Sequence, residues 1–109
     1  MNELTLTDLQ LADLCDDAAD YIDTHGWTKF EFENEQGQVC IGGALSRCMR
    51  KTHDGFMSMT TMRRFMGILC ELHPELPRTI GMISWNDRVV HDQSEVTDFL
   101  RYAGKTLRA

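Results

Sequence analysis

The chain has 109 residues, a formal net charge of −6, and 42% hydrophobic and 26% charged residues. This size and balance predict one globular domain over residues 1–109 with a single modest core, and they argue against extensive disorder. An acidic chain repels a phosphate backbone unless its basic residues are segregated, so nucleic acid is not an expected partner. The absence of a signal-peptide pattern and of a long apolar run predicts a cytoplasmic protein without a membrane partner.

Residues 5–24 have apolar positions at helical spacing, which predicts an amphipathic helix. Thr5, with Asp8 three residues later, resembles a capping box, and Gly26 suits a left-handed cap at the end of the helix. The other face of this helix is acidic, and one variant of a binding function is that this face mimics nucleic acid. The aspartates of that face are Asp13, Asp16, Asp17, Asp20 and Asp23.

The hydrophobic period then changes to strict alternation over residues 29–33, which is typical of a half-buried strand. Residues 34–37 have the composition of a turn in which Gly37 is free to adopt a positive φ, and residues 38–41 read as a second short strand. Together they predict an antiparallel β-hairpin. Two strands alone are marginally stable, so a helix is expected to cover the face carrying Phe30 and Phe32.

The rest of the chain is predicted to be helical. One helix is expected over residues 42–51, and another should begin at Ser58 or Thr60 and end before Pro74. Residues 78–86 fit a short helix or a strand, with helix favoured. Asp92 with Glu95 resembles a capping box at the start of the last helix. The predicted fold class is therefore α+β, with four or five helices packed around one two-stranded antiparallel β-hairpin.

Two signatures about 40 residues apart tie the middle of the chain to its end: a Cys-x-x-Gly-Ala-Leu segment and a Trp-Asn-Asp triplet. Over roughly residues 20–105 they resemble an actinobacterial and actinophage family of unknown function. The resemblance implies a bacterial or bacteriophage cytoplasmic setting and no established activity. Gly42 and the Met-rich segment 56–70 depart from the family pattern. The matching residues are Trp27, Gly37, Cys40, Gly43, Ala44, Leu45, Trp85, Asn86, Asp87, Glu95 and Val96.

The Gly42-Gly43 pair, lying between a predicted strand and a predicted helix, has two interpretations. A helix N-terminus presents free N–H groups to an anion, which would suit phosphate. However, the segment lacks the Lys-Ser/Thr of a P-loop, and close packing of the helix on the hairpin is the favoured interpretation.

The Trp85-Asn86-Asp87 triplet also has two interpretations. In the favoured one, Trp85 fills the core while Asn86 and Asp87 bond to nearby backbone. In the other, the triplet lines a cleft.

The cysteines and histidines do not indicate a metal or catalytic centre. No Cys-x-x-Cys pair is present and no spacing matches a zinc site, so buried thiols are expected rather than disulfides, with no metal and no cofactor. A cysteine nucleophile would need a partnered histidine, and nothing in the sequence requires one. No catalytic residue is therefore assigned. The residues concerned are Cys15, Cys40, Cys48, Cys70, His25, His53, His73 and His91.

The segment 56–66 is the best candidate for a partner or dimer surface. Phe56 and Met57, in the loop before the predicted helix, are more apolar residues than the core of a small domain needs. Met57, Met59 and Met62 belong to a methionine stripe that is usually core, although methionine is also favoured on adaptable binding surfaces. The leading hypothesis is a non-enzymatic interaction protein that binds and modulates a host protein. The alternative is a small-molecule binder or small enzyme that uses a cleft between Gly42-Gly43 and Trp85-Asn86-Asp87. A homodimer is compatible with either hypothesis.

Overall fold

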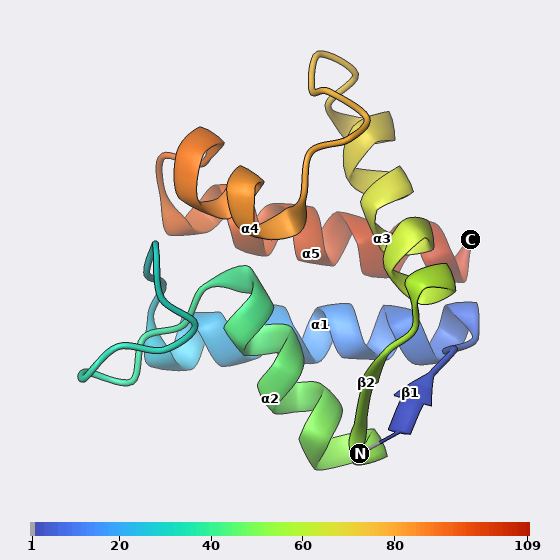
Figure 1. The fold of residues 1–109 in the computed structure, drawn as a ribbon, viewed down its shortest axis with the longest axis horizontal. Coiled ribbons are helices and arrows are strands. Elements are labelled where there is room, and N and C mark those ends of the chain that lie inside the picture. The colour runs from blue at the N-terminus through green and yellow to red at the C-terminus, as the bar shows by residue number, and fades with distance from the viewer. Residues whose placement is uncertain (1) are drawn as a thin grey trace.

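The computed structural model describes residues 2–109 and is dominated by helices (Figure 1). The two longest helices, α1 and α5, lie side by side, with α2 packed on α1 and α3 on α5. A small sheet joins the N-terminus to the segment after α2. The elements in chain order are β1 (Asn2–Leu4), α1 (Asp8–His25), α2 (Ile41–His53), β2 (Gly55–Met57), α3 (Met59–Leu72), α4 (Met82–Ser84), a π-helix η1 (Trp85–Val89) and α5 (Gln93–Arg108).

The predicted mixture of helices with a small two-stranded sheet is confirmed, but the predicted antiparallel hairpin is wrong. The two strands are β1 and β2, which pair in parallel with Asn2 opposite Gly55. Residues 26–40 instead form an irregular loop in which Val39 makes isolated bridges to Trp27 and Glu33. The predicted turn within this loop is present, since Gly37 has a φ of 81° and its N–H bonds to the carbonyl of Asn34.

The hairpin fails because the two alternating phenylalanines are not buried together on one face. Phe30 and Phe32 are 71% and 62% exposed, so no buried face sets a strand register. Phe30 also has a φ of 69°, a left-handed conformation that interrupts an extended strand. The backbone of this loop is held by hydrogen bonds within the loop and by two side chains of η1, Asn86 and Asp87.

Local capping explains where the helices begin. The first helix starts later than predicted, because Thr7 and Gln10 form its capping box while the Thr5 hydroxyl donates to Ser58. Gly26 follows that helix with the expected positive φ, 94°. Ser58 caps α3, and the Asp92–Glu95 capping box of α5 is confirmed.

The core is one cluster in which aromatic rings join three elements. The ring of Phe99 on α5 lies 5.2 Å from that of Phe65 on α3 and 5.3 Å from that of Trp85 on η1, measured between centroids. Such tilted and edge-on pairs are favourable arrangements for buried rings. The favoured prediction of a helix near residues 78–86 is confirmed over residues 82–89, where α4 runs into η1.

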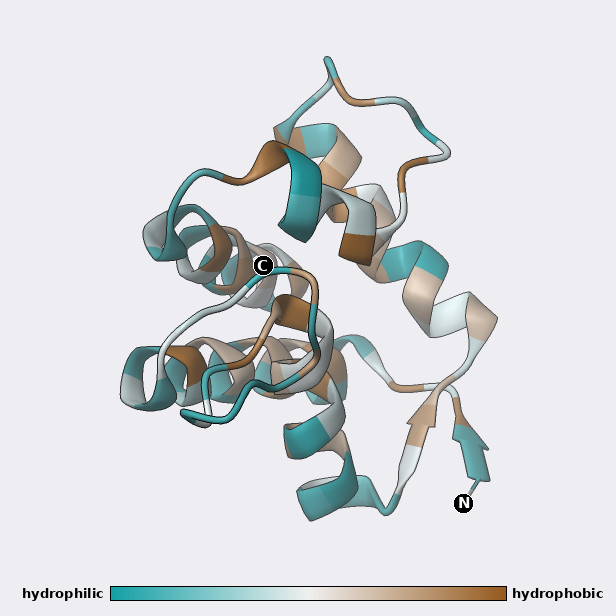
Figure 2. Ribbon diagram, turned by 60° about the vertical axis from the view of Figure 1, so that its left-hand side comes forward, coloured by the Kyte–Doolittle hydropathy of each residue, from teal (hydrophilic) through white to brown (hydrophobic). Residues whose placement is uncertain are grey.

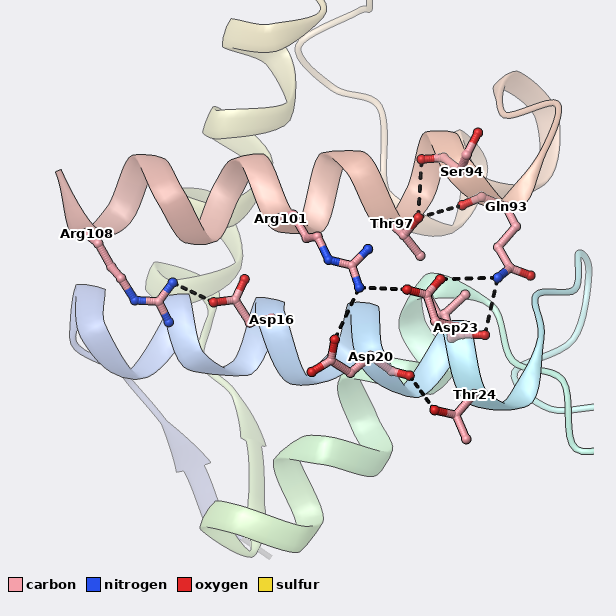
Figure 3. Close-up of polar contacts among 10 residues, drawn as sticks. Asp16, Asp20, Asp23, Thr24, Gln93, Ser94, Thr97, Arg101 and Arg108 are labelled. Carbon is pink, nitrogen blue, oxygen red and sulfur yellow. Dashed lines mark hydrogen bonds and ion pairs between the residues drawn. The ribbon is translucent and has the colours of Figure 1, made fainter.

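Two arginines of α5 make ion pairs with the acidic face of α1 (Figure 3). Arg101 pairs with Asp20 and Asp23, and Arg108 pairs with Asp13 and Asp16. Four of the five aspartates are therefore neutralised within the fold, and this face is poorly suited to mimic nucleic acid. None of the helices within residues 2–109 combines the length and apolar character that crossing a bilayer requires.

Candidate functional site

The Trp85-Asn86-Asp87 triplet is part of the interior of the protein. Trp85 is 2% exposed and packs edge-on against Phe99, and Asn86 is fully buried. Both residues belong to η1, whose wider helical turn is an uncommon geometry. The triplet therefore has one side chain in the core and two directed at the loop over residues 26–40.

Asn86 uses all of its hydrogen-bonding capacity to hold that loop and the start of α2. Its Oδ1 accepts from the Trp27 indole Nε1 at 2.8 Å and from the Ile41 backbone N–H at 3.0 Å. Its Nδ2 donates to the Thr28 carbonyl at 3.2 Å and to Asp87 Oδ1 at 2.9 Å. A buried carboxamide is stable only when such partners are present, so Asn86 acts as a structural bracket.

Asp87 extends this bracket to the strained part of the loop. Its Oδ1 accepts a hydrogen bond from the backbone N–H of Phe30 at 2.9 Å. Because a left-handed backbone costs free energy at a residue with a Cβ, Phe30 needs such an anchor to keep its conformation. The triplet thus fixes the backbone from which two exposed phenylalanines project.

The start of α2 is packed against the same loop. The Phe32 carbonyl accepts from the Cys40 N–H at 3.2 Å, and the Cys40 Sγ accepts from the Gly43 N–H at 3.3 Å. A Cβ on Gly43 would lie 2.1 Å from the Phe32 carbonyl oxygen, so only glycine fits. With Ile41 bonded to Asn86, protein groups occupy the N–H groups that a phosphate would need. This geometry favours the packing interpretation of Gly42-Gly43.

The Cys40 thiol is suited to capping rather than to nucleophilic chemistry. Burial raises the pKa of Cys40, and the charge of Asp87 acts in the same direction, although hydrogen bonds from backbone N–H groups oppose it. A thiol with a raised pKa holds its proton at neutral pH, and the thiolate is the reactive form. Among the residues described, 2–109, no three His, Cys, Asp or Glu side chains gather into a group that could hold a metal ion.

A groove of about 580 Å³ lies beside α2, and we call it the Phe–Met groove. Its walls come from α2, β2, α3, α4 and the loop over residues 26–40. Figure 2 shows β2 as a hydrophobic segment, in contrast to the hydrophilic end of α2 that precedes it. The groove's large apolar residues are Phe32, Leu45, Met49, Phe56, Met57, Met62 and Met82; its other lining residues are Glu33, Gly42, Gly43, Ser46, Arg47, Arg50 and Gly55.

The structure brings most of the predicted site residues to this one groove. Phe56, Met57 and Met62 line it, and Gly42 and Gly43 line it at the N-terminal end of α2. Met59 is 61% exposed but is not part of the lining. The residues Trp85, Asn86 and Asp87 do not line the groove, and Asn86 contacts the start of α2 directly instead of facing it across a cleft.

Sequence reasoning missed Phe32, Met49 and Met82 as lining residues. Phe32 was predicted to be covered by a helix; its ring contacts α2 at Gly42 but remains 62% exposed. The usable signal was the pair of glycines itself, since small residues often mark where another group approaches closely. Met49 and Met82 carry no comparable signal, because a methionine at a helical position usually belongs to the core.

A second hollow of about 490 Å³ lies between α1 and α2 and is lined mainly by polar and charged residues. Asp17 and Asp20 face Arg47 and Lys51 across it, and the rings of Tyr21 and His25 stack at 3.9 Å between centroids. Burial and the neighbouring aspartates raise the pKa of Asp17. Two acids and two bases line this hollow, so it shows no clear preference for one ligand charge.

Comparison with known proteins gives a family but no activity. A family model described as "Family of unknown function (DUF6197)" matches residues 6–106. No curated protein and no solved structure matches the chain.

Proposed function

The chain belongs to this family of unknown function, and we propose that it is a non-enzymatic interaction protein that binds and modulates a host protein through the Phe–Met groove. The setting we propose is the cytoplasm of an actinobacterium, with the gene carried by the bacterium or by a phage. The observation that carries the proposal is an apolar groove whose rim displays two phenylalanines, Phe32 and Phe56, that are 62% and 51% exposed. Leaving large apolar side chains in water is unfavourable, and contiguous exposed patches of this kind mark interaction sites.

The composition of the groove suits a protein partner. Four of its lining residues are methionines, whose flexible side chains adapt to the shape of inserted groups. Aromatic residues such as Phe32 and Phe56 are enriched where partners bury surface against each other. The bracket made by Asn86 and Asp87 fixes the Phe32 loop before binding, which lowers the entropy cost of association.

Affinity capture from an actinobacterial lysate tests this proposal. The bait is the full chain, compared with Phe56→Asp and with Met57→Asp/Met62→Asp. Leu9→Asp is the matched control, since Leu9 is 63% exposed and lies outside the groove. Each variant is first checked for native circular dichroism and cooperative unfolding.

We expect one abundant partner that Leu9→Asp retains and that both groove variants lose. Retention of the partner by folded Phe56→Asp would exclude the groove as its binding site. Absence of any specific partner for the folded wild-type bait would count against a host-protein function. It would favour a small-molecule ligand, for which the Phe–Met groove, with a volume in the usual ligand range, replaces the predicted cleft between Gly42-Gly43 and Trp85-Asn86-Asp87.

A further inference from the structure

One wall of the Phe–Met groove is a stripe along α2. Ser46, Arg47 and Arg50 are exposed residues of this stripe, and Gly42 and Gly43 form its N-terminal end. Positions 43, 46 and 50 have the i, i+3, i+7 spacing of one helix face. From 42 to 50 the helix rises about 12 Å at ~1.5 Å per residue, which is the length of two helical turns. The groove is therefore long enough for two turns of a partner helix.

The charges at the rim of this groove differ from those of the chain as a whole. The chain carries 17 acidic and 11 basic residues, yet the groove is lined by two arginines and a single acid, Glu33. Arg47 pairs with Glu33, their Nη2 and Oε1 atoms being 2.6 Å apart. Arg50 is exposed and makes no ion pair with any residue in 2–109.

Half of the eight arginines make ion pairs within residues 2–109, and the unpaired half consists of Arg50, Arg63, Arg78 and Arg88. Arg101 and Arg108 on α5 each pair with two aspartates of α1 (Figure 3). Of the four unpaired arginines, Arg50 is the one that lines the Phe–Met groove, where its guanidinium can pair with a group from outside the chain. A charge in this position steers association and selects the sign of the partner's charge.

From these observations, and resting on the function proposed above, we infer that the occupant of the Phe–Met groove is an acidic amphipathic helix of the partner protein. Apolar side chains at i, i+3 or i+4, and i+7 enter the groove between Phe32 and Phe56 and meet the methionines. A carboxylate on the flank of the same helix pairs with Arg50. This is helix-in-groove recognition with a basic rim selecting an acidic ligand.

A display library of random 16-residue peptides, selected against the full-length protein, tests this inference directly and does not require the natural partner. We expect the selected peptides to share an apolar i, i+3 or i+4, i+7 pattern and an excess of Asp and Glu. The best peptide, labelled with fluorescein, should bind about tenfold more weakly to Arg50→Glu. Arg78→Glu is the control, because Arg78 is exposed in a loop and does not line the groove.

Two further measurements distinguish ion pairing and helix formation from non-specific hydrophobic binding. Raising the salt concentration should weaken binding to the wild type more than to Arg50→Ala, because salt screens an exposed ion pair. A proline in the middle of the selected peptide should abolish binding, while alanine at the same non-contacting position should not. The bound peptide should also gain helical circular dichroism.

The outcomes distinguish this inference from the function on which it rests. The selected peptides could require Phe56 yet show neither acidic enrichment nor sensitivity to Arg50→Glu. This result would overturn the inference that the partner is acidic, while the groove would remain a protein-binding site. Peptides that tolerate the central proline would replace the helix with an extended segment. A library that yields no peptide dependent on Phe56 would overturn both this inference and the groove as a protein-binding site.

Discussion

The carboxamide oxygen of Asn86 accepts a hydrogen bond from the indole nitrogen of Trp27 at 2.8 Å, across 59 positions of the sequence. The same oxygen also accepts from the N–H of Ile41 at the start of α2. One buried side chain thus joins η1, the loop over residues 26–40 and α2. This bracket determines where the Phe32 side of the Phe–Met groove lies.

Replacing Asn86 with alanine should remove this bracket. The change leaves the Trp27 indole and the Ile41 N–H without their partner, and each unsatisfied buried donor is costly. We expect a loss of about 3 kcal/mol in the free energy of unfolding, measured by urea denaturation. Asp87→Ala, which spares both of those bonds, should cost about 1 kcal/mol. Equal, small losses for the two variants would show that Asn86 is not the organising residue.

Gly43 and Gly67 provide a matched pair of glycine substitutions within helices. A Cβ at Gly43 would lie 2.1 Å from the Phe32 carbonyl oxygen, whereas nothing lies within 4 Å of a Cβ at Gly67. Gly43→Ala should therefore destabilise the protein by about 2 kcal/mol, because the loop must shift. Gly67→Ala should stabilise it by about 0.5–1 kcal/mol, since alanine is the better helix former. Thermal unfolding that shifts in the same direction for both variants would argue against this packing of the loop on α2.

The left-handed backbone at Phe30 predicts that replacing this residue with glycine stabilises the protein. Phe30 is 71% exposed and has a φ of 69°, so glycine loses few contacts and relieves strain. Phe30→Gly should raise the free energy of unfolding by about 0.5–1 kcal/mol. Phe32→Gly is the control, because Phe32 is outside the left-handed region and its ring lies over Gly42. It should lower stability, and the reverse ranking would mean that the loop has a different conformation.

The buried Cys15 thiol links stability to alkaline pH. Burial, helped by the charge of Asp16 and opposed by that of Arg108, raises the pKa of Cys15 from 9.0 to about 12. The folded state therefore holds this proton more tightly than the unfolded state. The resulting stability is complete below pH 9 and is lost as the pH rises toward 12.

Urea denaturation of the wild type and Cys15→Ala between about pH 7 and pH 11 measures this effect. Replacement with alanine removes the titrating thiol, so the stability of the variant should fall less steeply above pH 9. Cys40 and Cys48, whose pKa values burial also raises, remain in both proteins and cancel in the comparison. Parallel pH profiles would show that Cys15 is not protected in the folded state.

The sequence predicted those parts of the fold that depend on local signals. Ser58, Asp92 and Glu95 cap helices as expected, because capping involves residues three positions apart. The hairpin prediction rested on the alternation of apolar and polar residues around Phe30 and Phe32. Such alternation indicates a strand only when one face becomes buried. The observed loop conformation depends on a hydrogen bond from the Phe30 N–H to Asp87, 57 positions away in the sequence. No local sequence pattern reveals such a contact.

The candidate site was predictable to a similar degree. Composition singled out Phe56, Met57, Met59 and Met62, of which all but Met59 line the groove. The sequence could not predict that Gly42 and Gly43 line the same groove beside Phe32, because this arrangement depends on how the loop packs on α2. Of the residues in the two sequence signatures, Cys40 and Asn86 build this packing, and Gly43 and Leu45 line the groove.

The most direct measurement is methionine-methyl NMR of the full-length protein, titrated with the best peptide from the display selection. Met49, Met57, Met62 and Met82 line the Phe–Met groove, whereas Met66 on the same helix as Met62 does not. We expect the four groove methyl resonances to shift together and saturate with one affinity, while the Met66 resonance stays in place. Shifts confined to Met66 or Met59, with the groove methyls unchanged by a bound peptide, would show that partners bind elsewhere.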